Sequence, residues 1–250
     1  MAAARDLLRA VADLAEDSYR QTVSLASRIL AGSGANDLIW GHASVRDRGG
    51  RGVWIKQASW GLEEVTPALV HLVSPDGNVL HGEGPRHSEY PIHTEIMLAR
   101  PDVGGVVHVH SRAAVAMGAS GHPLRPVSHE ANYFVPPPVP RFTQTSDLIL
   151  TRELGAAVAR TLGNCAALFL VNHGIVCAGP DLETATVAAI LLERACQQQI
   201  LTQSLGPGYQ WTPEDESLAK REHTYSPRQI RQAWDYLVRA LPGPADAPQG

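Results

Sequence analysis

Two kinds of hydrophobic spacing divide the chain. Over residues 5–30, apolar side chains return every three or four positions, which predicts one long amphipathic helix that ends at the Gly-Ser-Gly run 32–34. Short apolar runs then flank two polar turns, 47–52 and 74–78, and this arrangement predicts two β-hairpins. Their strands are expected at 44–46, 53–56, 69–73 and 79–80.

Beyond residue 90 the pattern alternates between helix and strand. Helices are expected at 91–100, 112–118, 148–162 and 181–203, and strands at 103–109, 166–171 and 175–178. The Pro-Pro-Pro-Val-Pro segment 136–140 should form a rigid connector, because proline suits neither a sheet ladder nor a helix interior. A capping box at 226–229 begins the last helix, and the tail 242–250 is expected to be disordered. The pattern predicts a single α/β domain over 1–241.

Composition narrows the possible partners. The chain has 250 residues, of which 44% are hydrophobic, so it can bury a large core without disulfides. Its net charge is -4 and its basic residues are scattered, which argues against nucleic acid and anionic membranes as partners. No apolar run approaches the roughly 18 residues of a membrane span. The three cysteines share no CxxC spacing and suit reduced thiols, so a cytoplasmic protein is expected.

Histidines are the first candidates for chemistry. His108 and His110 alternate in the predicted strand 103–109, so both project from one face with Cα atoms roughly 6 to 7 Å apart. One metal ion can bridge that gap. An isolated His-x-His is also typical of two hydrogen-bonded or surface histidines.

His173 and Glu89 add to this pattern. His173 interrupts an apolar strand and is followed by Gly174, which indicates a side chain that points into a site. Three neutral imidazoles on a divalent ion leave positions open for substrate, as in catalytic metal sites. Glu89 precedes the helix that leads into the His-x-His strand, where a simple cap is the alternative role. His93 and Glu95 on that helix are expected to be structural.

Taken together, four segments resemble the class II aldolase/adducin family over residues 7 to about 203: GHASVR at 41–46, SEYPIH at 88–93, RPDVGGVVHVH at 100–110 and NHG at 172–174. The resemblance implies a three-layer α/β/α fold with a central, mainly antiparallel sheet, and a homotetramer with active sites near subunit interfaces. It also implies His108, His110 and His173 as ligands of one divalent zinc, manganese or iron ion per subunit. Glu89 would be the catalytic acid/base close to that metal.

Departures from the family pattern bear on the substrate. His42 stands where phosphate-binding relatives have Asn, and Arg86-His87-Ser88 keeps one hydroxyl, which favours a carboxylate over a phosphate. Arg46 is expected to be a salt-bridged strand residue. Tyr225 is a catalytic candidate that would act on a neighbouring subunit. The candidate substrate-binding residues are His42, Ser44, Arg86, His87, Ser88, His129 and Tyr133.

Three further segments, 61–67, 84–91 and 126–130, look like the branch of the family that decarboxylates hydroxylated aromatic acids, such as dihydroxyphthalate. We therefore expect a metal-dependent carbon-carbon lyase, a decarboxylase of a small hydroxylated aromatic (di)carboxylic acid. Three alternatives stay open: an aldolase or epimerase of a (phospho)sugar or hydroxy-aldehyde, a non-haem iron oxygenase of secondary metabolism, and a non-enzymatic adducin-like module.

Overall fold

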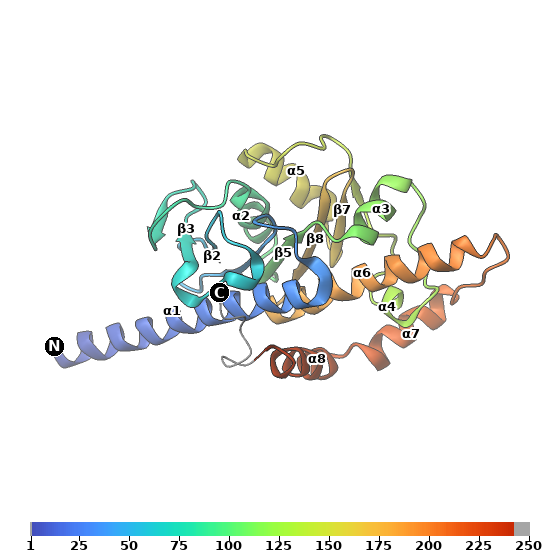
Figure 1. Ribbon diagram of the computed structural model, residues 1–250. Coiled ribbons are helices and arrows are strands. Elements are labelled where there is room, and N and C mark those ends of the chain that lie inside the picture. Colours follow the sequence, from blue (N-terminus) through green and yellow to red (C-terminus); the bar gives the residue numbers. More distant parts are fainter. Residues whose placement is uncertain (1, 243–250) are drawn as a thin grey trace.

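One central sheet organises the computed structural model, which describes residues 2–242 (Figure 1). Its eight strands run in the order β4-β3-β2-β1-β5-β8-β7-β6, and every neighbouring pair is antiparallel except β6 and β7. The strands are β1 (His42–Arg46), β2 (Val53–Lys56), β3 (Val70–Val73), β4 (Val79–His81), β5 (Gly105–Val109), β6 (Arg141–Phe142), β7 (Ala167–Leu170) and β8 (Gly174–Gly179).

Helices cover both faces of this sheet, so the expected three-layer α/β/α fold is confirmed (Figure 1). On one face, α2 and α5 bury apolar residues such as Ile92 and Val158 against the strands. On the other face, α1 and α6 share a core with the strands, and α8 adds Trp234 to it. The helices are α1 (Ala2–Leu30), α2 (Tyr90–Ala99), α3 (Arg112–Ser120), α4 (His129–Asn132), α5 (Arg152–Leu162), α6 (Leu182–Ser204), α7 (Glu214–Thr224) and α8 (Pro227–Arg239).

Strand register brings distant parts of the chain to one end of the sheet. In the antiparallel β5–β8 pair, Val109 at the end of β5 lies opposite Ile175 near the start of β8. His42 in β1 is the direct partner of His108 in β5. The residues that follow β5, those that precede β8 and those that begin β1 therefore lie together at the same end of the strands.

Most of the predicted elements are confirmed, including both hairpins. The 74–78 turn closes with a 2.9 Å hydrogen bond from the Ser74 N–H to the Asn78 carbonyl, and Gly77 has a φ of +82°. The proline-rich segment 136–140 forms neither helix nor strand, as expected. Among residues 2–242, no helix is long and apolar enough to cross a membrane. The expected disorder of the tail concerns 243–250, which lie outside the described residues.

The predicted helix 148–162 is wrong at its start. The helix α5 begins at Arg152, and the Thr151 hydroxyl caps it by accepting a hydrogen bond from the Leu154 N–H. Ile149 precedes this cap and lies outside the helix, and its backbone N–H donates to the Glu89 carboxylate at 2.8 Å. The pattern also missed α4, β6 and α7. In α7 only Ser217 is buried, so this helix has no apolar stripe that a periodicity could reveal.

Candidate active site

Three imidazoles converge where β5 ends and β8 begins. The ring nitrogen Nδ1 of His108 donates to the Ile175 carbonyl at 2.9 Å, and Nδ1 of His110 donates to the Asp37 carboxylate at 2.6 Å. Because both partners accept hydrogen bonds, each neutral ring carries its proton on Nδ1 and keeps a lone pair on Nε2. His173 completes the cluster, and one ligand atom from each ring lies within 4.8 Å of the others.

Local backbone geometry explains the Asn-His-Gly run that carries His173. Asn172 adopts a φ of +59°, a left-handed conformation that asparagine tolerates better than most residues. A Cβ at position 174 would lie 2.7 Å from the His110 ring, 2.8 Å from the Val109 carbonyl and 2.9 Å from the His108 ring. Glycine is therefore required there for the strand to pass so close to the imidazoles.

Glu89 lies against the same rings. Its Oε1 accepts the Ile149 N–H and is 3.7 Å from Nε2 of His173, while Oε2 is 3.8 Å from Nε2 of His108. These nitrogen–oxygen separations are too long for hydrogen bonds. The side chain caps nothing in α2, so the alternative role as a helix cap is wrong. The carboxyl group is 3% exposed, and this burial raises the pKa of Glu89 in spite of the Ile149 hydrogen bond.

Burial also keeps His108 and His173 neutral. Desolvation is the largest cause that lowers the pKa of His173, to about 4, and the neighbouring His110 lowers it further. The pKa of His108 is lowered well below its usual value for the same reason, with added effects of His110 and His173. Neutral rings with free Nε2 lone pairs are the form that binds a divalent metal. Nε2 of His108 and both ring nitrogens of His173 are buried without a partner among the described residues.

A second group of histidines lies beside the first. The His42 and His87 rings contact each other with centroids 3.8 Å apart, and Nδ1 of His42 is 2.5 Å from Nε2 of His93. Nδ1 of His93 is 2.6 Å from the Ser44 hydroxyl. Burial lowers the pKa values of His87 and His93 to about 3. Two of the expected substrate-binding residues, His42 and Ser44, thus have a polar atom engaged by His93.

Lys56 is the charged residue near the site that the sequence pattern missed. Its side chain at the end of β2 is fully buried, and Nζ donates to the Ile39 carbonyl at 2.9 Å. Among the described residues it forms no ion pair with a carboxylate. Burial lowers the pKa of Lys56 to about 8, and its charge helps to lower the pKa values of His42 and His87. A lysine that closes an apolar strand is usually read as a solvated strand end.

Three other substrate-binding candidates have different surroundings. Arg86 donates from Nε to the Gly77 carbonyl at 2.7 Å, and its guanidinium lies 4.4 Å from the centre of the Tyr90 ring. These contacts hold Arg86 against Gly77 of the 74–78 turn and against Tyr90, and its Nη1 also donates to the His87 backbone carbonyl at 3.4 Å. Ser88 and His129 are exposed. Their roles in binding a substrate stay predictions.

Tyr133 and Tyr225 lie at the other end of β8. Their rings meet edge to face with centroids 5.4 Å apart, and they line a hollow of about 420 Å³ together with Pro180 and Asp181. Asp181 follows the end of β8, whereas His173 precedes its start, so roughly 17 Å of strand separates the two places. Within one chain these tyrosines are not brought to Glu89.

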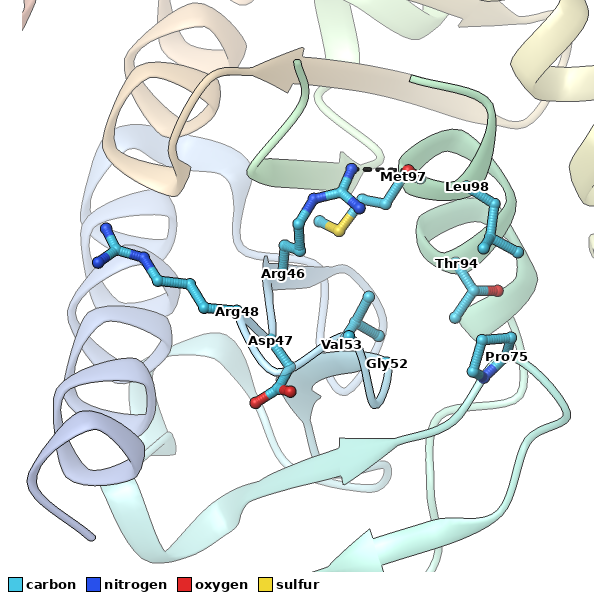
Figure 2. Close-up of a pocket in the computed structure, with 10 residues that line it drawn as sticks. Arg46, Asp47, Arg48, Gly52, Val53, Pro75, Thr94, Met97 and Leu98 are labelled. Atoms are coloured by element: carbon cyan, nitrogen blue, oxygen red, sulfur yellow. Dashed lines mark hydrogen bonds between the residues drawn. The ribbon is translucent and has the colours of Figure 1, made fainter. Parts of the chain in front are cut away.

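Arg46 departs from its expected role. Its guanidinium donates to the backbone carbonyls of Met97 at 2.6 Å, Arg100 at 2.8 Å and Val103 at 2.6 Å. Figure 2 shows the bond to Met97. The predicted salt bridge is therefore wrong, because three carbonyls take the place of a carboxylate. Arg46 and Asp47 border a hollow of about 160 Å³ (Figure 2), and the Asp47 carboxylate is held by Arg51. Arg46 and Asp47 thus have their charges satisfied nearby, and no histidine is among the described residues that line this hollow.

Comparisons with known proteins agree with this geometry. Residues 21–200 match the family model described as the Class II Aldolase and Adducin N-terminal domain. Two proteins named 3,4-dihydroxyphthalate decarboxylase are similar: one from Arthrobacter keyseri is 28% identical, with 79% of this chain and 84% of that protein covered, and one from Terrabacter sp. (strain DBF63) is 29% identical, with 80% and 87% covered. A solved L-fuculose 1-phosphate aldolase from Glaciozyma antarctica PI12 shares the fold, with a TM-score of 0.80 at 23% identity over 90% of this chain and 89% of its own. The chain therefore belongs to the class II aldolase and adducin family.

Proposed function

We propose that the protein is a metal-dependent carbon-carbon lyase that decarboxylates a hydroxylated aromatic acid. The observation that carries this proposal is a cluster of three imidazoles beside a buried carboxyl group, which lies 3.7 Å from Nε2 of His173 and 3.8 Å from Nε2 of His108 without a hydrogen bond to either. The two similar decarboxylases support the choice of reaction. A sugar-phosphate aldolase is supported by the fold alone.

The donor set fits a divalent metal. His108, His110 and His173 would hold the ion through Nε2, and the orphaned buried nitrogens of His108 and His173 are what a bound cation would satisfy. Imidazole suits zinc, manganese and iron, so all three are candidates. When bound, the ion supplies Lewis-acid stabilisation of negative charge on a substrate oxygen. Asp37 and the Ile175 carbonyl fix the planes of the His110 and His108 rings.

Glu89 would move the proton. The bond between the aromatic ring of the substrate and its carboxylate breaks, and the electron pair stays on the ring carbon while carbon dioxide leaves. A proton then binds to that ring carbon. Burial raises the pKa of Glu89, which increases the fraction that can donate a proton near neutral pH. The Ile149 N–H holds Oε1, so Oε2 faces His108 and His42 and is the oxygen available for this transfer.

A buried cation supports an acid as the substrate. Among the residues that the structure describes, Nζ of Lys56 has one hydrogen-bond partner, the Ile39 carbonyl, although an ammonium group can donate three bonds. We propose that Lys56 binds a carboxylate of the substrate. His42 contributes at most one contact to a phosphate cradle, because Nδ1 already contacts His93 and Nε2 is the nitrogen that is left.

We propose that the protein assembles into a homotetramer, as the resemblance to its family implies. Tyr133 and Tyr225 lie too far along β8 to serve the site of their own chain. We propose that they reach the site of a neighbouring subunit, where a phenol could orient the substrate.

Substrate trials test the reaction directly. Protein loaded with zinc, manganese or iron is incubated with 3,4-dihydroxyphthalate or with L-fuculose 1-phosphate, while carbon dioxide release and oxygen uptake are recorded. We expect carbon dioxide from the aromatic acid without oxygen uptake, and none from a Glu89→Gln variant. Cleavage of the sugar phosphate alone would replace the proposal with an aldolase, and oxygen uptake would replace it with an oxygenase. Failure to bind metal would favour an adducin-like module.

A further inference from the structure

Three buried polar side chains form a hydrogen-bonded line that ends at Glu89. The Ser44 hydroxyl contacts Nδ1 of His93 at 2.6 Å, and Nε2 of His93 contacts Nδ1 of His42 at 2.5 Å. His42 and Ser44 lie two residues apart in β1 and share one face of the sheet, while His93 comes from α2. All three side chains have no exposure to solvent.

The free end of this line points at the proposed proton donor. Nε2 of His42 has no hydrogen-bond partner among the described residues and lies 3.9 Å from Oε2 of Glu89. No other nitrogen of His42 is available, because Nδ1 contacts His93. The position of the His42 ring therefore determines which atom lies next to Oε2 of Glu89 on that side.

The protons of the two rings are coupled. Each neutral imidazole carries one ring proton, and the short contact between His42 and His93 needs one proton between the two nitrogens. If His93 donates from Nε2, His42 carries its proton on Nε2 and offers a donor to Glu89. If His93 instead carries its proton on Nδ1, His42 offers a lone pair. The state of His93 thus sets the state of His42.

Proton transfer through the line is not its function. The Ser44 hydroxyl bonds no second side chain among the described residues, so a proton passed to it would find no further side-chain acceptor. What the line does is fix the plane of the His42 ring and tie its tautomer to that of His93, as outer-shell hydrogen bonds do for functional histidines.

We propose that His93 is a positioning residue of the active site, which acts through His42 to hold the Glu89 carboxyl group in its working orientation. This inference rests on the proposed function of Glu89 as the proton donor. It assigns to His93 more than the structural role expected from the sequence. Ser44 supports His93 from the other side, and the two contacts can be removed separately.

Two substitutions of His93 separate positioning from packing. The amide of a glutamine reaches about as far as Nε2 of histidine, so His93→Gln keeps the contact with His42 and loses the contact with Ser44. The amide of an asparagine reaches about as far as Nδ1, so His93→Asn keeps Ser44 and loses His42. Both changes leave a polar side chain in the same buried place, and thermal unfolding of each variant reports the cost to the fold.

The first readout is kinetic and uses the zinc-loaded protein. We expect His93→Asn to lower kcat about 10- to 100-fold with KM and zinc content within about threefold of wild type, and His93→Gln to stay within about threefold in all. An equal loss in both variants, or a loss of kcat that simply follows the drop in Tm, would overturn the proposal.

The second readout does not need catalysis. Nitrogen-15 NMR of histidine-labelled protein, with and without zinc, reports the tautomer of each imidazole. We expect one tautomer of His42 in wild type and His93→Gln, and a mixture in His93→Asn. An unchanged His42 signal in His93→Asn contradicts the inference even if the enzyme is active. If the wild type has no lyase activity but His93→Asn still shows the expected NMR change, the positioning of His42 by His93 stands and the proposed function is refuted.

Discussion

The two groups of histidines at the edge of the sheet differ in what their ring nitrogens contact. In the first group, His108 and His110 each have Nδ1 held by a carbonyl or carboxylate, which leaves Nε2 free. In the second group, Nδ1 of His42 contacts Nε2 of His93. His110 has a side-chain exposure of 19%, whereas His42 is fully buried. The two groups therefore differ in the partner of Nδ1, which is a carbonyl or carboxylate for His108 and His110 and another imidazole for His42.

Loss of a ring from the first group should have the largest effect. We expect His108→Ala to lose bound metal and to lower turnover by more than about 10³-fold, because a Lewis acid contributes several kcal/mol to catalysis. Metal analysis of the purified protein and a turnover assay measure this. His81→Ala, at a partly exposed histidine of β4, is the matched control and should change neither. Full metal content in His108→Ala would remove His108 from the ligands.

Glu89→Gln separates proton transfer from metal binding. The amide keeps the size of the side chain and an oxygen that can accept the Ile149 N–H, but it cannot donate the proton. We expect metal content to stay at the wild-type level while turnover falls about 10²- to 10⁴-fold. If the metal is lost as well, Glu89 belongs to the ligands and the distinction between holding the ion and moving the proton fails.

Asp37→Asn weakens the support of one imidazole. The carboxylate accepts the proton on Nδ1 of His110, and outer-shell partners of this kind contribute about 10- to 100-fold to metal affinity. We expect a decrease in this range in a competitive metal titration. Asp76→Asn, at a surface carboxylate bound to Arg152, should leave the affinity unchanged. Equal affinities in all three proteins would show that His110 needs no such support.

The smallest effect is expected at Lys56, and it depends on pH. Because burial lowers the pKa of Lys56 to about 8, the ammonium is charged below that pH and loses its proton above it. The KM for an acidic substrate should therefore rise as the pH passes about 8 in wild type. In Lys56→Met, KM below pH 8 should be about 10-fold higher than in wild type, and it should not rise further as the pH passes 8. Lys220→Met, at a partly exposed lysine, should behave as wild type. A wild-type KM independent of pH would mean that Lys56 binds no substrate carboxylate.

Short-range pattern predicted much of the fold. The hairpin turns, the helix cap at Asp181 and the capping box at Ser226 appear where the sequence placed them, because turn and cap geometry depends on a few adjacent residues. Period-two spacing also put His108 and His110 on the same side of a strand. The predicted start of α5 was wrong because Thr151, which caps the helix, was included in it as a helical residue.

The sequence by itself therefore determined which residue types could bind a metal and, through motifs, which family the chain belongs to. Only the tertiary structure decided which histidines keep a free nitrogen, that Arg46 binds carbonyls and that Lys56 is buried beside His42 and His87. Each of these depends on a partner many residues away, such as Asp37 for His110 or Ile175 for His108. Hydrogen bonding and desolvation act through space, and the spacing along a chain does not record them.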